Sequence, residues 1–209
     1  MKTFNLIKTF VAAAVAVGAL AGAAQAADIA SGVVRKKVAG IDLIVYRTGV
    51  KDVVTLSGSL PAGDIFAGTG NVAVPTLVGM MLDKGTTRQD QFAIAAKMEK
   101  VGAGLRFGVD TQMLSFGGRM LQKDLPMMVD LLAEQLRYPA FADAELTKVK
   151  AQFIGGTRQA LEDPGAMAGE AFALAIYPEG HPNRPVPTRA YLEAAPKVTV
   201  SELKAFHAK

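Results

Sequence analysis

The sequence of 209 residues contains no cysteine and only two histidines, His181 and His207. Without cysteine the chain can form no disulfide bond, use no cysteine nucleophile and bind no metal through thiolates. The two histidines lie far apart in the sequence and in dissimilar surroundings, so they form a poor pair of zinc ligands. His181 stands between Gly180 and Pro182, which favours a position in a rigid loop over a catalytic role.

Other common functional motifs are missing as well. The glycine-rich stretch 58–70 is not followed by the Lys-Ser/Thr pair of a phosphate-binding loop, and no serine lies in a G-x-S-x-G nucleophile motif. The net charge of +4 comes from basic residues scattered among acidic ones, whereas nucleic-acid-binding proteins gather them into one stripe. The sequence therefore indicates no nucleotide site, no serine hydrolase site and no nucleic-acid partner.

Residues 1–26 carry the pattern of a secretory signal peptide. Lys2 and Lys8 accompany the uncharged apolar run 10–21, and Ala24-Gln25-Ala26 supplies the small residues of a cleavage site. A membrane helix needs about 20 strongly apolar residues, and this run is shorter and rich in alanine. We therefore predict cleavage after Ala26, a periplasmic or secreted mature chain 27–209, and no membrane attachment after cleavage.

Strand patterns and helical patterns alternate along the rest of the chain. β-branched residues predict a hairpin of strands 33–38 and 41–46 around Ala39-Gly40, and a third strand over 53–58. A second hairpin, 105–109 with 113–117, follows from alternating apolar residues. Helices are predicted at 75–85 with Pro75 first and Gly85 as C-terminal cap, from Thr87 to Gly102, at 125–136, at 144–162 with Asp143 as N-cap, and in a shorter segment ending at Ile176.

These elements predict an α+β fold. The strands come in antiparallel hairpins separated by long helices, so we expect a largely antiparallel sheet with helices packed on one of its faces. The helix at 125–136 shows the clearest apolar stripe, which consists of Leu125, Met128, Val129, Leu132 and Leu136. Thr199 to Glu202 has the spacing of a capping box, and the chain ends soon afterwards at Lys209.

A series of short motifs in a fixed order resembles the insulinase/pitrilysin family of zinc metallopeptidases, which includes the mitochondrial processing peptidase. The resemblance covers roughly 33–207. Its motifs are Leu82-Asp83-Lys84-Gly85-Thr86, Val101-Gly102-Ala103, Tyr138-Pro139-Ala140-Phe141, Asp163-Pro164, and Tyr177-Pro178 with Gly180-His181-Pro182. It implies an insulinase-type half-domain over 27–209, which we expect to be incomplete at its C-terminal end because further strands follow the capping-box helix in the family.

The positions that carry catalysis in this family hold unsuitable residues here. In catalytic members the first helix reads H-x-x-E-H before a Met-Leu-x-Lys-Gly-Thr ending, with two histidines as zinc ligands and the glutamate as general base. Aligning the endings puts Thr76, Gly79 and Met80 at these positions. Threonine is a poor zinc ligand, glycine has no side chain, and a thioether prefers Cu(I). The family's third ligand, a glutamate on the long helix, falls near Gly156 or Thr157. The resemblance therefore implies no catalytic residue and no metal ligand, and no residue is assigned to substrate binding.

The resemblance favours a non-catalytic homologue that forms the inert half of a peptide-degrading chamber. Its partner would be a zinc-bearing insulinase-type homologue or a missing C-terminal half, which would share the peptide substrate and hold the zinc; this chain itself would carry no cofactor. The alternative is an independent periplasmic binding or scaffold domain with no proteolytic role. Whether the chain is an enzyme stays open, although no nucleophile–base pair or metal cluster in the sequence favours one.

Overall fold

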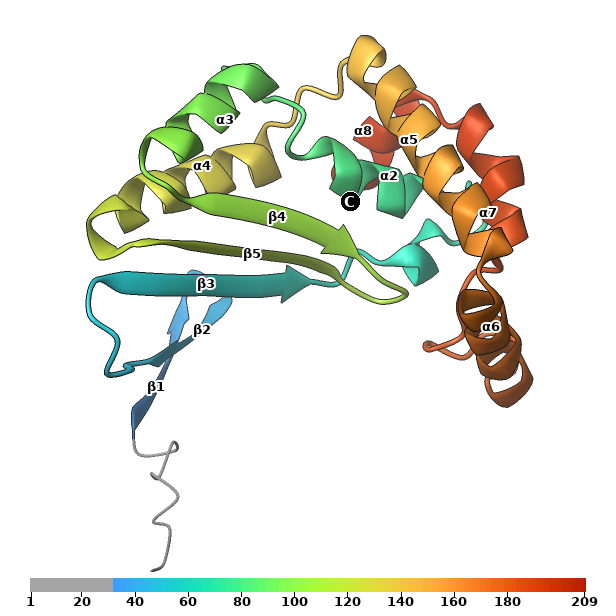
Figure 1. Ribbon diagram of the computed structural model, residues 1–209, viewed down its shortest axis with the longest axis horizontal. Helices are drawn as coiled ribbons and strands as arrows, with labels where there is room; N and C mark the ends of the chain where they lie inside the picture. Colours follow the sequence, from blue (N-terminus) through green and yellow to red (C-terminus); the bar gives the residue numbers. More distant parts are fainter. Residues whose placement is uncertain (1–31) are drawn as a thin grey trace, which may run out of the picture. The chain divides into compact units, whose positions relative to one another are not determined.

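The computed structural model describes residues 32–209 (Figure 1). The signal peptide predicted for residues 1–26 lies outside the described residues and stays a prediction. The chain divides into two compact units with the boundary between Lys51 and Asp52. None of the helices within 32–209 is both long and apolar enough to cross a membrane.

The first unit contains a hairpin of strands β1 (Val33–Val38) and β2 (Ile41–Tyr46), paired antiparallel from Val33 opposite Tyr46 to Val38 opposite Ile41. The two turn residues, Ala39 and Gly40, have φ angles of 47° and 85°. Positive φ at both central residues is the geometry that matches the twist of the flanking strands in a two-residue hairpin. The hairpin predicted from the sequence is therefore confirmed.

The second unit is built on a three-stranded antiparallel sheet in the order β3-β5-β4. Its strands are β3 (Val53–Leu60), β4 (Gly104–Val109) and β5 (Leu114–Leu121). Helices α3 (Gln91–Lys100) and α4 (Leu125–Arg137) lie along one side of this sheet (Figure 1). The buried core between them consists of Leu105, Met120, Met128 and Leu132. The α+β fold with antiparallel strands and helices on one sheet face is thus confirmed.

A second core consists of helices alone. Helix α2 (Val74–Met81) packs against α5 (Asp143–Glu162) and α8 (Val200–His207), and α7 (Thr188–Ala194) packs against α5. Helix α6 (Pro164–Ile176) follows α5 directly. The largest fully buried side chains of this core are Leu77, Met81, Val149, Val198 and Leu203. Helix α7 was not predicted, because a helix this short, which begins after Pro187 and ends before Pro196, shows less than two turns of periodicity.

Several helix ends differ from the predictions. The helix predicted from Thr87 starts at Gln91, because the Asp90 side chain is the N-cap that accepts a hydrogen bond from the Ala93 amide at 2.8 Å. The cap predicted at Gly85 is wrong: α2 ends at Met81, and Gly85 lies beyond it with a φ of 119° in a β-bridge to Asp90.

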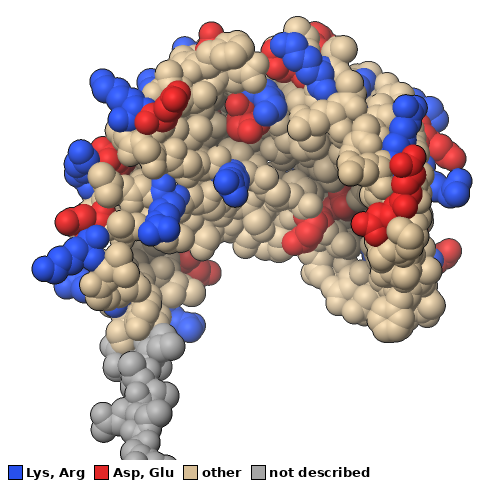
Figure 2. Space-filling model, in the orientation of Figure 1, with Lys and Arg blue, Asp and Glu red and all other residues tan. Residues whose placement is uncertain are grey.

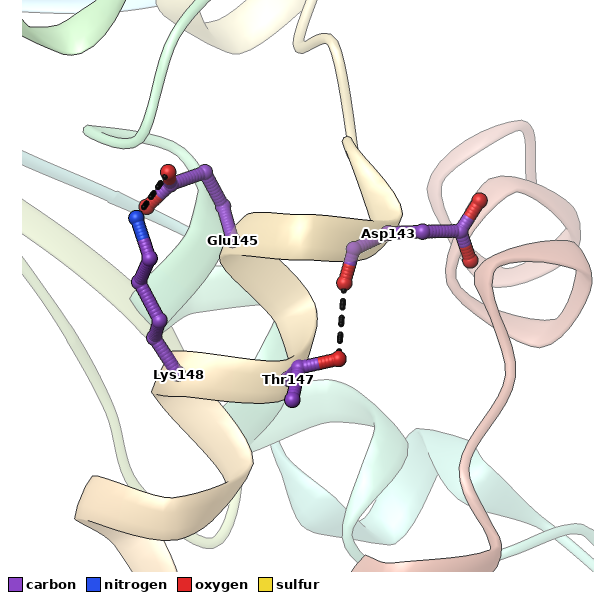
Figure 3. A network of polar contacts seen from close by, with 4 residues as sticks. All are labelled: Asp143, Glu145, Thr147 and Lys148. Atoms are coloured by element: carbon purple, nitrogen blue, oxygen red, sulfur yellow. Dashed lines mark hydrogen bonds and ion pairs between the residues drawn. The ribbon is translucent and has the colours of Figure 1, made fainter.

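The N-cap predicted at Asp143 is also wrong. Ala142 occupies the cap, and Asp143 is the first helical residue of α5, with its carboxylate turned away from the helix (Figure 3). The first turn is held instead by Thr147, whose hydroxyl donates to the Asp143 carbonyl at 3.0 Å, and by a 2.8 Å ion pair between Lys148 and Glu145. In this position the negative charge of Asp143 still interacts favourably with the positive end of the helix dipole.

The stripe predicted on α4 is shifted by one residue. Met128 and Leu132 are buried as predicted, but Val129 is 43% exposed and Leu131 takes its place in the core. The spacing of three and four residues allows either residue to complete the apolar face, and it is Leu131, 4% exposed, that is buried. The capping box is confirmed: Thr199 accepts from the Glu202 amide, and the Glu202 carboxylate accepts from the Thr199 amide at 2.7 Å.

Two adjacent glycines of β5 provide a matched test of the packing between strands. A Cβ on Gly118 would lie 2.4 Å from the Gly104 carbonyl oxygen, whereas a Cβ on Gly117 would meet nothing closer than the Leu56 carbonyl oxygen at 3.6 Å. We expect Gly118→Ala to lower the free energy of unfolding by about 1–3 kcal/mol. Gly117→Ala should leave it unchanged or raise it by about 0.5 kcal/mol. Urea denaturation measures both, and equal effects would contradict the register.

Candidate functional site

The three residues aligned with the family's catalytic positions lie on one face of α2. Gly79 and Met80 lie three and four residues after Thr76, which places the three Cα atoms on the same side of the helix. Gly79 is buried, while Thr76 and Met80 are half-buried. Met80 packs against the helical core. The helix geometry that would hold a metal site is present, and its side chains are used for packing and hydrogen bonding.

Thr76 belongs to a partly buried hydrogen-bond network centred on Asp64. The Thr76 hydroxyl donates to Oδ1 of Asp64 at 3.1 Å, and the Tyr191 hydroxyl donates to Oδ2 of the same carboxylate. Asp64 begins the 3-10 turn η2 (Asp64–Ala67), and Tyr191 lies on α7. Three separate segments therefore meet at one carboxylate, which binds Thr76, the residue that the resemblance aligns with the first metal ligand.

Burial sets the protonation of this network. Desolvation raises the pKa of Asp64 above its ordinary value of 3.8, while the hydrogen bonds from Tyr191 and Thr76 act in the opposite direction and the nearby charge of Asp110 adds to the rise. Burial also raises the pKa of the Tyr191 phenol, with Asp64 as the second cause. Tyr191 is therefore a hydrogen-bond donor rather than an acid at neutral pH.

Gly79, which the resemblance aligns with the general base, lies against a neighbouring strand. A Cβ placed on Gly79 would lie 2.5 Å from Cγ2 of Val109, the last residue of β4. Val109 is β-branched and stiff at χ1, so it cannot turn aside as the end of a long side chain could. A glutamate cannot enter this position unless Val109 or the backbone of β4 moves.

On α5 the structure distinguishes the two candidate positions for the third ligand. Thr157 is 8% exposed and its hydroxyl donates to the Phe153 carbonyl at 2.7 Å, one turn earlier. Gly156 faces open space. Phe153 packs edge-on against Tyr191, with 5.6 Å between ring centroids. Thr157 is therefore the residue on the inner side of the helix, and Gly156 lies on its outer side.

The donors at these positions do not suit zinc. They are a hydroxyl on Thr76, no side chain at Gly79, a thioether on Met80 and a hydroxyl bound to backbone on Thr157, whereas zinc sites in proteins use imidazole, thiolate and carboxylate. Within residues 32–209 no three His, Asp or Glu side chains are placed to hold a metal ion together. That this chain binds no zinc stays a prediction.

The two histidines are engaged elsewhere. His181 stacks on Tyr177 with 4.6 Å between ring centroids, and its Nδ1 accepts from the Asn183 amide at 3.0 Å. His207 lies 2.7 Å from the Leu136 carbonyl through Nε2 and packs edge-on against Phe141. Each ring has its own local partners, which agrees with the loop position predicted for His181.

Asp64 and Tyr191 were missed by the sequence analysis. Asp64 looks like a turn residue after Pro61, and Tyr191 lies in a short helix that gave no periodic signal. They are 127 residues apart, so no local spacing links them. Aligning α2 with the family's ligand motif also gives no sign of Asp64, because this residue lies outside the aligned helix.

The second unit thus combines a sheet covered by α3 and α4 with a cluster of helices packed around α2. The sequence profile of the insulinase family (peptidase family M16) matches residues 51–164. The chain therefore belongs to the insulinase family. A comparison with curated proteins finds no match.

Two solved structures share this architecture. One is the inactive domain of a peptidase of family M16 from Pseudomonas fluorescens, with a TM-score of 0.73 and 25% identity over 84% of this chain. The other is a protease from Helicobacter pylori, with a TM-score of 0.73 and 14% identity over 84% of this chain. This chain spans 43% and 42% of those two chains, so it corresponds to less than half of each.

The raised pKa of Asp64 predicts a particular pH dependence of stability. The folded state binds the Asp64 proton more tightly than the unfolded state, so this group's contribution to the free energy of unfolding is fully present below pH 3.8 and is lost as pH rises through the raised value. Asp64→Asn removes this titration. The difference in free energy of unfolding, variant minus wild type, should therefore grow with pH across that window in urea titrations.

Tyr191→Phe is the companion variant for that experiment. It removes a hydrogen bond that lowers the pKa of Asp64. In this variant the pH range over which Asp64 loses its contribution to the free energy of unfolding should therefore extend to higher pH than in the wild type. Parallel pH curves for wild type, Asp64→Asn and Tyr191→Phe would contradict the electrostatic account of the network.

The contact between α2 and β4 is tested by a double-mutant cycle. Gly79→Ala should lower the free energy of unfolding by about 1–3 kcal/mol because its Cβ meets Val109. In a Val109→Ala background the same change should cost much less, with a coupling energy of about 0.5–3 kcal/mol. Gly156→Ala, where nothing lies within 4 Å, is the control and should stabilise α5 by up to about 1 kcal/mol. Additive effects at 79 and 109 would contradict the contact.

Proposed function

We propose that this chain is a non-catalytic insulinase-family protein that forms the inert wall of a peptide-degrading chamber beside a zinc-bearing partner. The observation that carries the proposal is the close approach of Val109 to Gly79, with 2.5 Å between a Cβ at 79 and Cγ2 of Val109. This contact fills the place of the general base with packed apolar atoms. If only one zinc ligand were missing, a neighbouring side chain could take its place. Here the space that the side chain of the general base would need is occupied by Val109 of β4.

The family relationship supports the remainder of the proposal. The solved structure from Pseudomonas fluorescens is described as an inactive domain, and this chain matches 43% of it. A further half of similar size in the same assembly would bury the surfaces of this one and supply the metal. The proposed partner is a zinc-bearing insulinase-type homologue or a second half of the same protein, and the shared ligand is a peptide. We extend the proposal to the periplasm or the outside of the cell, and the signal-peptide pattern of residues 1–26 supports this location.

The purified chain should bind no stoichiometric zinc and hydrolyse no peptide, because hydroxyl, thioether and absent side chains replace the ligand set. Metal analysis after dialysis and a broad peptide-digestion assay measure both. A tagged form expressed in its native host should co-purify with a family member that contains H-x-x-E-H, and only this complex should cleave peptides in a manner that a chelator abolishes.

A matched control separates the partner's chemistry from this chain's contribution. Replacing the glutamate of the partner's H-x-x-E-H motif with glutamine should abolish peptide cleavage by the complex without dissociating the complex. One zinc per chain with chelator-sensitive activity in the isolated protein would overturn the proposal. A monodisperse chain that never associates with an H-x-x-E-H protein would favour the independent binding or scaffold domain instead.

A further inference from the structure

The sheet of the second unit has a second face, opposite to the one that α3 and α4 cover. Side chains alternate between the two faces along a strand. Leu105, Met120 and their neighbours in the core point toward the helices, so Thr55, Ser57, Arg106 and Arg119 belong to the other face. The strands β3, β4 and β5 contain these two arginines and no aspartate, glutamate or lysine. This face is therefore purely basic in its formal charge.

Strand register leaves space beside each arginine. Arg106 pairs with Gly117 across β4 and β5, and Arg119 pairs with Gly104 in the same ladder. Across the other ladder, Arg119 pairs with Thr55 and Gly117 pairs with Ser57. Each guanidinium thus rises beside a residue without a side chain. A concavity of about 740 Å³ opens here, lined by both arginines, both glycines, Thr55 and Ser57. We refer to it as the Arg106–Arg119 concavity.

The positive charge of this concavity is not neutralised from within the described chain. The ion pairs among residues 32–209 join Lys37 to Asp42, Lys84 to Asp83 and Lys148 to Glu145, so neither arginine takes part in one. Figure 2 shows basic and acidic groups around the region of the sheet, with uncharged surface between them. Guanidinium groups form two parallel hydrogen bonds with carboxylates, and the two arginines have this capacity free.

We propose that the Arg106–Arg119 concavity binds the carboxylate side chains of an extended acidic peptide. This inference rests on the proposed function, in which the chain holds peptides without cleaving them. An extended peptide presents alternate side chains to one side, so acidic residues two apart face the same surface as the two arginines. Thr55 and Ser57 supply hydroxyls that can donate to or accept from the peptide backbone. The volume exceeds what one small anion fills, which favours a peptide over an isolated phosphate.

Fluorescence anisotropy with two labelled decapeptides tests the charge requirement. One has glutamate at every second position in an Ala/Ser background, and the other has glutamine at the same positions. The purified protein should bind the glutamate peptide at least about ten-fold more tightly, and the preference should weaken as salt rises. Arg106→Gln and Arg119→Gln should each remove most of this preference, while the charge-matched control Arg158→Gln on the exposed side of α5 should retain it.

A steric pair tests the location independently of charge. Gly117→Thr adds a side chain to the floor of the concavity, where a Cβ has ordinary contacts, while Gly108→Thr adds the same side chain to the same sheet face outside its lining. Threonine suits a strand, so both variants should fold, as judged by urea denaturation. Gly117→Thr should lower affinity for the glutamate peptide about ten-fold or more, and Gly108→Thr should not change it.

The outcomes separate this inference from the proposed function. Equal binding of the two peptides, or unchanged preference in the arginine variants, would overturn the inference while leaving a non-catalytic chamber wall intact. Inorganic phosphate that displaces the glutamate peptide at concentrations equal to the peptide's own Kd would also overturn it, because the site would then recognise a simple anion. Zinc-dependent cleavage by the isolated chain would overturn the proposed function even where the glutamate preference persists.

Discussion

The close approach of α2 to the end of β4 is the constraint on which the second unit depends. Because residue 79 has no side chain, Val109 can pack against the helix surface with its Cγ2 where a Cβ would otherwise lie. The same helix contributes Leu77, Val78 and Met81 to the helical core. One glycine therefore allows a single helix to join the sheet layer to the helical cluster. Protein interiors are densely packed, so a longer side chain at this point would separate the two.

The Asp64 network gives the other side of α2 a polar anchor. A buried carboxylate without partners is strongly unfavourable, and here Thr76 and Tyr191 each donate one hydrogen bond to it. Phe153 packs against the Tyr191 ring and so links α5 to the same point. A carboxylate, a phenol and an aromatic contact thus connect α2 to α5.

These contacts explain how a member of the insulinase family can keep the architecture with Thr76, Gly79 and Met80 at the aligned positions. The fold needs α2, α5 and the sheet to be held at fixed separations, and it does not need a particular chemistry to do so. The TM-score of 0.73 to two solved structures, at 25% and 14% identity, agrees with a scaffold that tolerates extensive change in sequence. On the sheet face away from the helices, glycines and two arginines leave an open basic surface. The surface of α2 at Gly79 is closed by packing, whereas Arg106 and Arg119 on the far face of the sheet are exposed.

Local features of the fold could be predicted from the amino-acid sequence. Turn residues, β-branched runs and helical periodicity were enough for both hairpins, for the long helices and for the α+β class, because these depend on contacts between near neighbours. The motif order was enough for the family, and the residues at Thr76, Gly79 and Met80 were visible as unsuitable ligands. Helix ends such as Asp90 and Ala142 were less well predicted, because the choice among adjacent caps costs only about 1 kcal/mol.

The surroundings of Thr76, Gly79 and Met80 depend on the tertiary structure. Asp64 and Tyr191 come together across 127 residues, and no pattern of local spacing encodes a hydrogen bond between a 3-10 turn and a short helix. The contact between Gly79 and Val109, the inward position of Thr157 and the exposure of Val129 are likewise set by which elements pack together. Burial and close approach are properties of the assembled chain, and the pKa shifts and excluded positions that define this site follow from them.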